Sequence, residues 1–294
     1  LSSTEIKALY NATKDQYQKD FTNLSRGTYN YTGYSIDKFG NVNSTEQRTL
    51  KIKNVPPSIN ASFPPNDHTT TNRTPKFNWT ASDPEGDTLT YELNITCHPG
   101  CSSDDRYITG ITQKKYVPTN YLKYLSDNGF SYNWSVRATD GNSYSNWTDE
   151  RTLNVQSLIQ VELPQNSTDF GGISMGGSDN TTDNNPEPMR VENTGNALVN
   201  SSFNSTSLWQ SVSHPSGNYQ YKITENESNS YNSSGSQTTW ANVPSMTTHA
   251  INDLNWTQQQ DSADIDLSVD VPSQEGAGSR QSTITVTSSL SEEE

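Results

Sequence analysis

The sequence predicts an all-β protein made of β-sandwiches in tandem. Short stretches in which apolar and polar residues alternate recur along the chain, separated by clusters of Gly, Asn, Asp, Ser and Pro. Fifteen Tyr and six Trp supply large apolar surfaces, while Leu, Ile, Val and Phe together make up only about a sixth of the 294 residues. That low aliphatic content and a net charge of −14 would ordinarily indicate disorder. The regular alternation favours a folded chain instead.

The first segment, residues 1–53, contains GTYNYTGYSIDKFGNVNSTEQRTLKI at residues 27–52. Its GTY turn and its closing Asp-x-x-Gly-Asn turn resemble the C-terminal half of the repeated immunoglobulin-like domains of archaeal cell-surface proteins. The resemblance implies that Tyr29 and Tyr31 face a core and that Asp37 shapes the hairpin turn.

Only 26 residues precede this motif, enough for two strands at most or for a short helix and a strand. The apolar spacing of STEIKALYNATKDQ, residues 3–16, favours a helix. We therefore predict that the first sandwich is incomplete. Three explanations stay open: the chain is a piece of a longer polypeptide, a neighbouring subunit inserts a strand, or the segment forms a smaller self-sufficient fold.

The middle segment, residues 54–157, opens with the proline-rich joint NVPPSINASFPPND. Trp79, Tyr91 and the run FSYNWSVRATDGNSYSNWTDERTLNV from residue 130 together resemble a fibronectin type III domain. The resemblance implies two packed sheets, with the aromatic side chains filling the space of about 10 Å between them.

The third segment, residues 158–294, follows a second joint near residues 154–165. DNTTDNNPEPMRVENTGNALVNSSF, YQYKITENES and ADIDLSVDVPSQEGAGSRQSTITVTSS resemble an immunoglobulin-like sandwich of archaeal secreted proteins. In the last of these, aliphatic residues alternate with acidic ones over residues 264–271, which predicts a solubilising outer stripe. The terminal SSLSEEE predicts a polar tail or the start of a linker.

The pattern Asn-x-Ser/Thr, with x not Pro, predicts N-glycosylation. It occurs at Asn11, Asn23, Asn30, Asn43, Asn60, Asn72, Asn78, Asn94, Asn133, Asn146, Asn166, Asn180, Asn200, Asn204, Asn226, Asn232 and Asn255. Asn78, Asn94 and Asn133 each occupy the outward phase of a predicted strand whose apolar residues point the other way. We therefore predict a glycosylated exterior and an extracellular or cell-surface location.

Two cysteines, Cys97 and Cys101, flank His-Pro-Gly at a predicted hairpin tip. Their spacing and the predicted oxidising compartment favour a disulfide. Free thiols are the alternative, and zinc is disfavoured because His98 is the only further ligand nearby.

The charge and hydropathy of the chain argue against nucleic-acid binding and against a transmembrane helix. The acidic charge, spread without a basic cluster, opposes nucleic-acid binding. No apolar run approaches the roughly 18 residues of a transmembrane helix, and Leu1 begins no signal sequence, so we expect any leader or anchor to lie outside this chain.

Few residues in the sequence form a candidate catalytic or metal-binding site, and we predict no catalytic residues and no cofactor. GISMG at residues 172–176 matches a nucleophile elbow around Ser174, but that motif requires a strand-to-helix turn, so a secreted hydrolase is disfavoured. Clustered acids offer weak calcium candidates, because calcium prefers oxygen ligands, although solvated acidic turns explain them as well. These candidates are Asp83, Glu85, Asp87, Asp179 and Asp183.

We predict a non-catalytic extracellular structural protein, a subunit of a glycosylated filament, sheath or surface layer built by contacts between β-edges. The expected partners are copies of itself or other surface proteins, together with N-linked glycans. The alternative is a monomeric adhesin or carbohydrate-binding module that uses exposed aromatics; the alternation leaves Trp147, Trp209, Trp240 and Trp256 unplaced.

Overall fold

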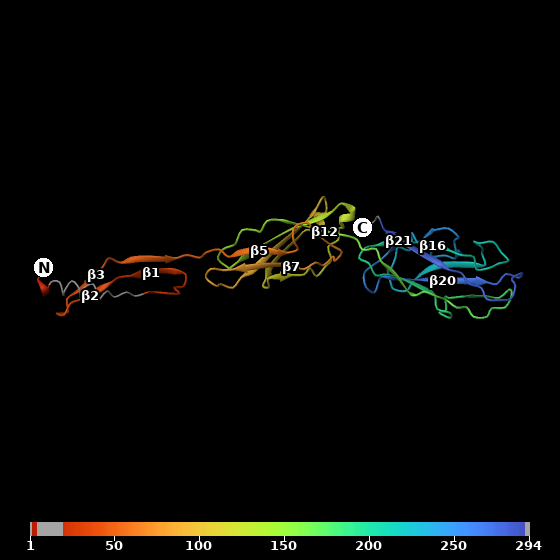
Figure 1. Cartoon of the computed structure of the whole chain (residues 1–294), viewed down its shortest axis with the longest axis horizontal. Coiled ribbons are helices and arrows are strands. Elements are labelled where there is room, and N and C mark those ends of the chain that lie inside the picture. Colours follow the sequence, from red (N-terminus) through yellow and green to blue (C-terminus); the bar gives the residue numbers. More distant parts are fainter. Residues whose placement is uncertain (1, 5–19, 292–294) are drawn as a thin grey trace.

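A computed structural model of the chain describes residues 2–4 and 20–291. Apart from short turns, the regular structure in residues 20–291 is almost entirely β-strand, and three bodies follow one another in an elongated row (Figure 1). The last described part of the chain, at the end of β21 (Ile284–Leu290), returns to the junction between the second and third bodies (Figure 1). The helix predicted at residues 3–16 falls almost entirely on residues 5–19, outside the described residues.

The first body contains two antiparallel strand pairs. They are β1 (Gly27–Tyr31) with β4 (Arg48–Ile52), and β2 (Tyr34–Ile36) with β3 (Val42–Ser44). None of the described residues before Pro57 is buried, and Tyr31 is 52% exposed. The prediction that Tyr29 and Tyr31 face a core is therefore wrong for Tyr31, since the described strands hold no second layer against it; Tyr29 is half-buried. Asp37 accepts hydrogen bonds from the backbone N–H of Phe39 and Asn41, as the turn motif implied.

The second body is a sandwich of three and five strands. Its strands are β5 (Ser58–Phe63), β6 (His68–Thr70), β7 (Phe77–Ser82), β8 (Thr90–His98), β9 (Arg106–Ile111), β10 (Lys115–Tyr116), β11 (Ser131–Thr139) and β12 (Arg151–Val155). One sheet has the order β10-β7-β5 and the other β6-β12-β11-β8-β9. All pairings are antiparallel except β6 with β12. This is the layered arrangement of immunoglobulin and fibronectin type III domains.

Aromatic residues fill the space between these two sheets, as the alternation predicted. Trp134 packs edge-on against Phe77 with ring centroids 5.1 Å apart, and Trp79 lies 5.4 Å from Tyr91. All four side chains are buried. Aromatic pairs in such geometry stabilise a core beyond their buried area, by about 0.5–1.5 kcal/mol each.

The third body is a second sandwich. Its strands are β13 (Val161–Gln165), β14 (Ser178–Asn180), β15 (Met189–Asn193), β16 (Val199–Ser205), β17 (Tyr219–Glu225), β18 (Ala241–Asn242), β19 (Thr248–Leu254), β20 (Ser262–Asp270) and β21 (Ile284–Leu290). One sheet has the order β13-β15-β20-β17-β18, with β14 also on β20, and the other has the order β19-β16-β21.

Two expectations about this body are corrected. Asp264 and Asp266 of β20 are buried, not a solvated stripe, because β20 is a central strand that is covered on both faces. Asp264 pairs with Arg190, and Asp266 accepts hydrogen bonds from the hydroxyls of Thr181 and Thr224, which compensates both carboxylates. The predicted polar tail begins too early: Ser288–Leu290 belong to the edge strand β21 and pair with β16, because the backbone continues the ladder and the Ser288 hydroxyl hydrogen-bonds that of Ser201 at 2.7 Å. Within the described part of the chain there is no helix of the length and hydropathy needed to span a bilayer.

Candidate functional site

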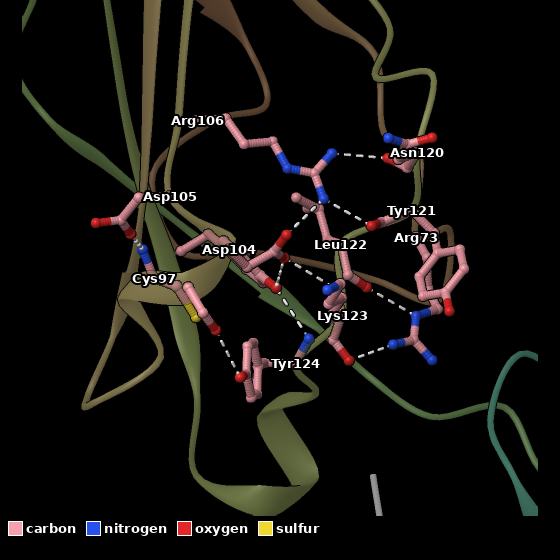
Figure 2. A network of polar contacts seen from close by, with 12 residues as sticks. Arg73, Cys97, Asp104, Asp105, Arg106, Asn120, Tyr121, Leu122, Lys123 and Tyr124 are labelled. Carbon is pink, nitrogen blue, oxygen red and sulfur yellow. Dashed lines mark hydrogen bonds and ion pairs between the residues drawn. The ribbon is translucent and has the colours of Figure 1, made fainter.

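The junction between the second and third bodies is built around Arg73, which precedes β7 and is only 4% exposed. Its guanidinium donates to the carbonyl oxygen of Leu122 at 2.8 Å, to that of Asn196 at 2.8 Å, and to that of Lys123. Figure 2 shows the side chain reaching the carbonyls of Leu122 and Lys123. Three carbonyls from two bodies therefore converge on one cation.

Two aromatic rings also pack against the guanidinium of Arg73. The guanidinium carbon of Arg73 lies 4.9 Å from the ring centroid of Tyr121 and 4.9 Å from that of Trp256. The two rings also contact each other edge-to-face, with centroids 4.9 Å apart. Cation–π contacts of this kind are worth about 2 kcal/mol when desolvated. We call Arg73, Tyr121, Leu122, Lys123, Asn196 and Trp256 the second joint.

Asn196 ties the linker between the bodies to the joint. Its side-chain oxygen accepts from the backbone N–H of Leu158 at 2.6 Å, and its amide nitrogen donates to the carbonyls of Gln156 and Thr71. The neighbouring Gly195 lies so close to the linker that an added Cβ would be 2.1 Å from the carbonyl oxygen of Leu158. This approach requires glycine.

A buried carboxylate supports the loop that faces Arg73. Asp104 is 5% exposed and accepts from the Tyr132 hydroxyl at 2.7 Å, the Lys123 backbone N–H at 2.8 Å and Arg106 at 2.7 Å. Arg106 also donates to the carbonyls of Asn120 and Tyr121, as Figure 2 shows. Burial and the adjacent carboxylate raise the pKa of Tyr132, which therefore stays a neutral donor.

The disulfide lies directly behind this loop. Cys97 and Cys101 are joined, with Cα atoms 5.2 Å apart. The short helix η1 (Ser102–Asp104) begins next to Cys101, and the backbone N–H of Cys97 donates to the carboxylate of Asp105 at 2.7 Å. The bridge thus braces the segment that supplies Asp104.

Apolar packing also crosses the junction. Ala197, from the turn before β16, is fully buried in the core cluster of the second body, and Leu290 at the end of β21 packs against the same cluster. The two bodies therefore share part of one core.

The junction between the first and second bodies is polar and exposed. Asp83, Asp87 and Asp140 place carboxylate oxygens within 4.8 Å of one another. Arg26 pairs with Asp87 at 2.8 Å, and the side-chain amide of Asn54 donates to Asp140 at 2.7 Å. We call these five residues the first joint.

The three carboxylates of the first joint could hold a hard cation such as calcium, although the guanidinium of Arg26 already balances part of their charge. The bond from Asn54 and the backbone N–H groups of Asn142 and Ser143 lower the pKa of Asp140. The sequence predicted Asp83 and Asp87 as candidate calcium ligands but not Asp140. The TDGN turn at the end of β11 is the sequence feature that could have indicated Asp140. Glu85 of the same loop is exposed and lies outside the group.

The other calcium candidates are not brought together. The carboxylate of Asp179 accepts from the backbone N–H of Asn180, and that of Asp183 accepts from Asn185. Within residues 20–291 they form no cluster of three acidic side chains.

The segment around Ser174 is a loop that leads into strand β14, so the described residues do not provide the strand-to-helix context of a nucleophile elbow. A nucleophile elbow also needs a histidine that follows it in the chain; of the two that follow Ser174, His214 contacts Ser205 and Tyr219. His249 is exposed on β19 opposite Ser202.

The sequon asparagines lie at the surface. Asn11 lies outside the described residues, and none of the sixteen others is buried.

The four tryptophans that the alternation left unplaced have different roles. Trp209 is buried and donates to the Asn218 carbonyl, Trp256 belongs to the second joint, and Trp147 and Trp240 are each 37% exposed.

Comparison with known proteins assigns no family. No family model matches the chain, and no curated protein matches it. Among solved structures, the chain is similar to the FN1–FN3 domains of chicken CNTN1, with 12% identity over 88% of this chain and 75% of that one, at a TM-score of 0.26. It is also similar to an α-L-rhamnosidase from Aspergillus terreus, with 11% identity over 79% of this chain and 27% of that one, at a TM-score of 0.26. At these scores neither match supports a functional argument, and the fold assignment rests on the sheet topology described above.

Proposed function

We propose that this chain is a non-catalytic extracellular structural protein, a subunit of a glycosylated cell-surface assembly such as a filament, sheath or surface layer of an archaeal type. The observation that most supports this is the second joint. A buried arginine held by two bodies, with a shared core, suits a chain that must keep a fixed extended shape under load.

The proposed assembly contact is at the first body. In the described residues β1 and β4 pair only with each other, so each has an edge that could accept a further strand. The same body exposes large apolar side chains, among them Ile36 at 69% and Val42 at 61%, which face each other across β2 and β3. A strand or apolar surface of a neighbouring subunit would cover them.

Electron microscopy of the purified chain tests this proposal, with Ile36→Lys/Val42→Lys as the assembly variant and Met246→Lys as the control. Met246 is 77% exposed on the third body, so the control adds a charge away from the proposed contact. We expect ordered polymers from the native and control chains and monomers from the double variant. Polymers that persist in the double variant, or a native chain that stays monomeric, would refute the contact.

An adhesin or carbohydrate-binding module is the second candidate. It is favoured by an exposed group of aromatic side chains on the second body, which includes Tyr107 at 56% and Tyr144 at 49% exposure. Binding of a soluble glycan by the monomer would distinguish it from the structural role.

A further inference from the structure

The outer face of the five-stranded sheet of the second body bears an ordered aromatic cluster. The guanidinium carbon of Arg137 lies 4.2 Å from the ring centroid of Tyr144 and 4.8 Å from that of Trp147. The rings of Trp147 and Tyr107 are 6.3 Å apart. We call Tyr107, Arg137, Tyr144 and Trp147 the aromatic platform; its three rings are 37–56% exposed.

Hydrogen bonds and an ion pair hold this platform in place. Glu92 faces Arg137 across β8 and β11 and pairs with it at 2.6 Å, and the Tyr107 hydroxyl donates to the same carboxylate. Two bonds between Val136 and Thr148, at 3.1 and 3.0 Å, fix the segment that supplies Trp147. The rings are therefore pre-organised while a large part of their apolar surface meets solvent, which is typical of a ligand site.

A sequon asparagine lies on the same face. Asn94 of β8 stands directly opposite Tyr107 of β9, a register that places their Cβ atoms about 4.5–5.5 Å apart. Its neighbours Leu93 and Ile95 are fully buried, so the pleat directs Asn94 outward. A sugar attached to Asn94 would thus start beside the Tyr107 ring.

We propose that the aromatic platform binds the N-linked glycan of Asn94, a proposal that rests on the glycosylation in the proposed function. The apolar C–H face of a pyranose packs on aromatic rings, and the Glu92 carboxylate can accept hydrogen bonds from sugar hydroxyls. A tethered ligand has an effective concentration in the millimolar range, so it outcompetes the same sugar free in solution. The glycan would shield the rings and stiffen the sheet surface.

Asn133 provides a matched control. It lies on β11 opposite Thr96, four residues before Arg137, which corresponds to about 13 Å along the strand. A glycan at Asn133 therefore begins on the same sheet but away from the platform.

A double-variant cycle tests the proposal in the full chain made in an N-glycosylating host, with occupancy of each sequon measured by glycopeptide mass spectrometry. We expect Asn94→Gln and Tyr107→Ser each to lower the Tm by about 4 °C, and the double variant to lose clearly less than the sum of the two, because the contact between the glycan and the ring can be lost only once, whereas the contacts of Tyr107 with Glu92 and Trp147 are lost in either background. Asn133→Gln combined with Tyr107→Ser should be additive. Enzymatic release of the Asn94 glycan should also be slower than that of the Asn133 glycan, and Tyr107→Ser should abolish the difference.

The outcomes separate this proposal from the proposed function. Suppose that Asn94 carries a glycan, that the effects of Asn94→Gln and Tyr107→Ser on the Tm are additive, and that this glycan is released as fast as the one on Asn133. This result overturns the platform proposal alone. An unmodified Asn94 overturns it together with the predicted glycosylation at that position. Binding of a soluble oligosaccharide by the Asn94→Gln chain, lost on Tyr107→Ser, overturns it in favour of the adhesin.

Discussion

The two joints of this molecule both contain an arginine, but they hold it in opposite ways. Arg73 of the second joint is buried, donates to three carbonyl oxygens and lies against two rings. Arg26 of the first joint keeps about a third of its side-chain surface exposed and pairs with Asp87, which is also partly exposed. A buried cation with fixed acceptors specifies one geometry, whereas a solvated ion pair contributes little and is screened by salt.

This difference implies a division of mechanical roles. The second and third bodies form one stiff unit, because part of the core and the hydrogen bonds of Asn196 cross between them. The first body is attached through polar contacts around Asn54 and Asp140, and none of the described residues before Pro57 is buried. A stiff rod with a separately attached assembly element suits the proposed structural role.

Arg73→Ala should produce the largest effect. It leaves three carbonyl oxygens without their donor and removes the cation between two rings, so the free energy of unfolding should fall by about 3 kcal/mol. Small-angle X-ray scattering should show a broader distribution of lengths, and calorimetry should separate the transitions of the two bodies. Arg73→Lys should restore little, because an ammonium lacks the planar fork of donors. A chain that keeps a single transition and its length would show that the apolar contacts suffice.

Removal of the disulfide by Cys97→Ser/Cys101→Ser should have the next largest effect. Loss of this short loop constraint should cost about 2 kcal/mol, with the destabilisation centred on the loop that carries Tyr121 to Tyr124. Hydrogen exchange of that loop is the measurement, with the strands of the third body as the internal control. If the amides of this loop exchange equally slowly in the native chain and in the variant without the disulfide, Asp104 alone fixes the loop.

Asp261→Asn should make the stability of the third body less dependent on pH. Burial and the nearby Glu227 raise the pKa of Asp261 to about 6, and Asp261 follows the loop that bears Trp256. Because the folded state binds this proton more tightly than the unfolded chain, stability falls as pH rises from about 4 to 6. The variant should therefore be more stable than the native chain by on the order of 1 kcal/mol at pH 7, with the difference vanishing below pH 4. Chemical denaturation at both pH values checks this, and a gain that is equal at both would exclude titration as the cause.

Arg26→Ala should have the smallest effect, less than about 1 kcal/mol, and it should shrink further in high salt. The thermal transition at low and high ionic strength is the measurement, and Lys115→Ala, an exposed cation on β10, is the control. A loss comparable with that of Arg73→Ala would contradict the contrast between the joints. Calcium is titrated in the same experiment, because Arg26→Ala removes the guanidinium that pairs with Asp87, one of the three carboxylates of the first joint.

Much of the fold could be predicted from local pattern, and much of the candidate site could not. Period-two alternation identified the inward residues of β8 and β11, such as Tyr91 and Trp134, because one-sided burial leaves a direct trace in sequence. The same rule failed on β20, where Asp264 pairs with Arg190 of β15 and Asp266 accepts from Thr224 of β17. Asp140 and Arg73 were missed because each is a single residue in a turn or loop, and its partners lie far away along the chain.

The strands, the turns, the density of sequons and the proximity of the two cysteines can all be predicted from the amino-acid sequence, since they depend on residues that are neighbours in the chain. Which loops meet is set by the folded arrangement of the strands. It placed Arg73 against Asn196, 123 residues away, and Asn94 beside Tyr107 on an exposed face. Such contacts depend on strand order and register, and a chain of alternating residues is compatible with several of each.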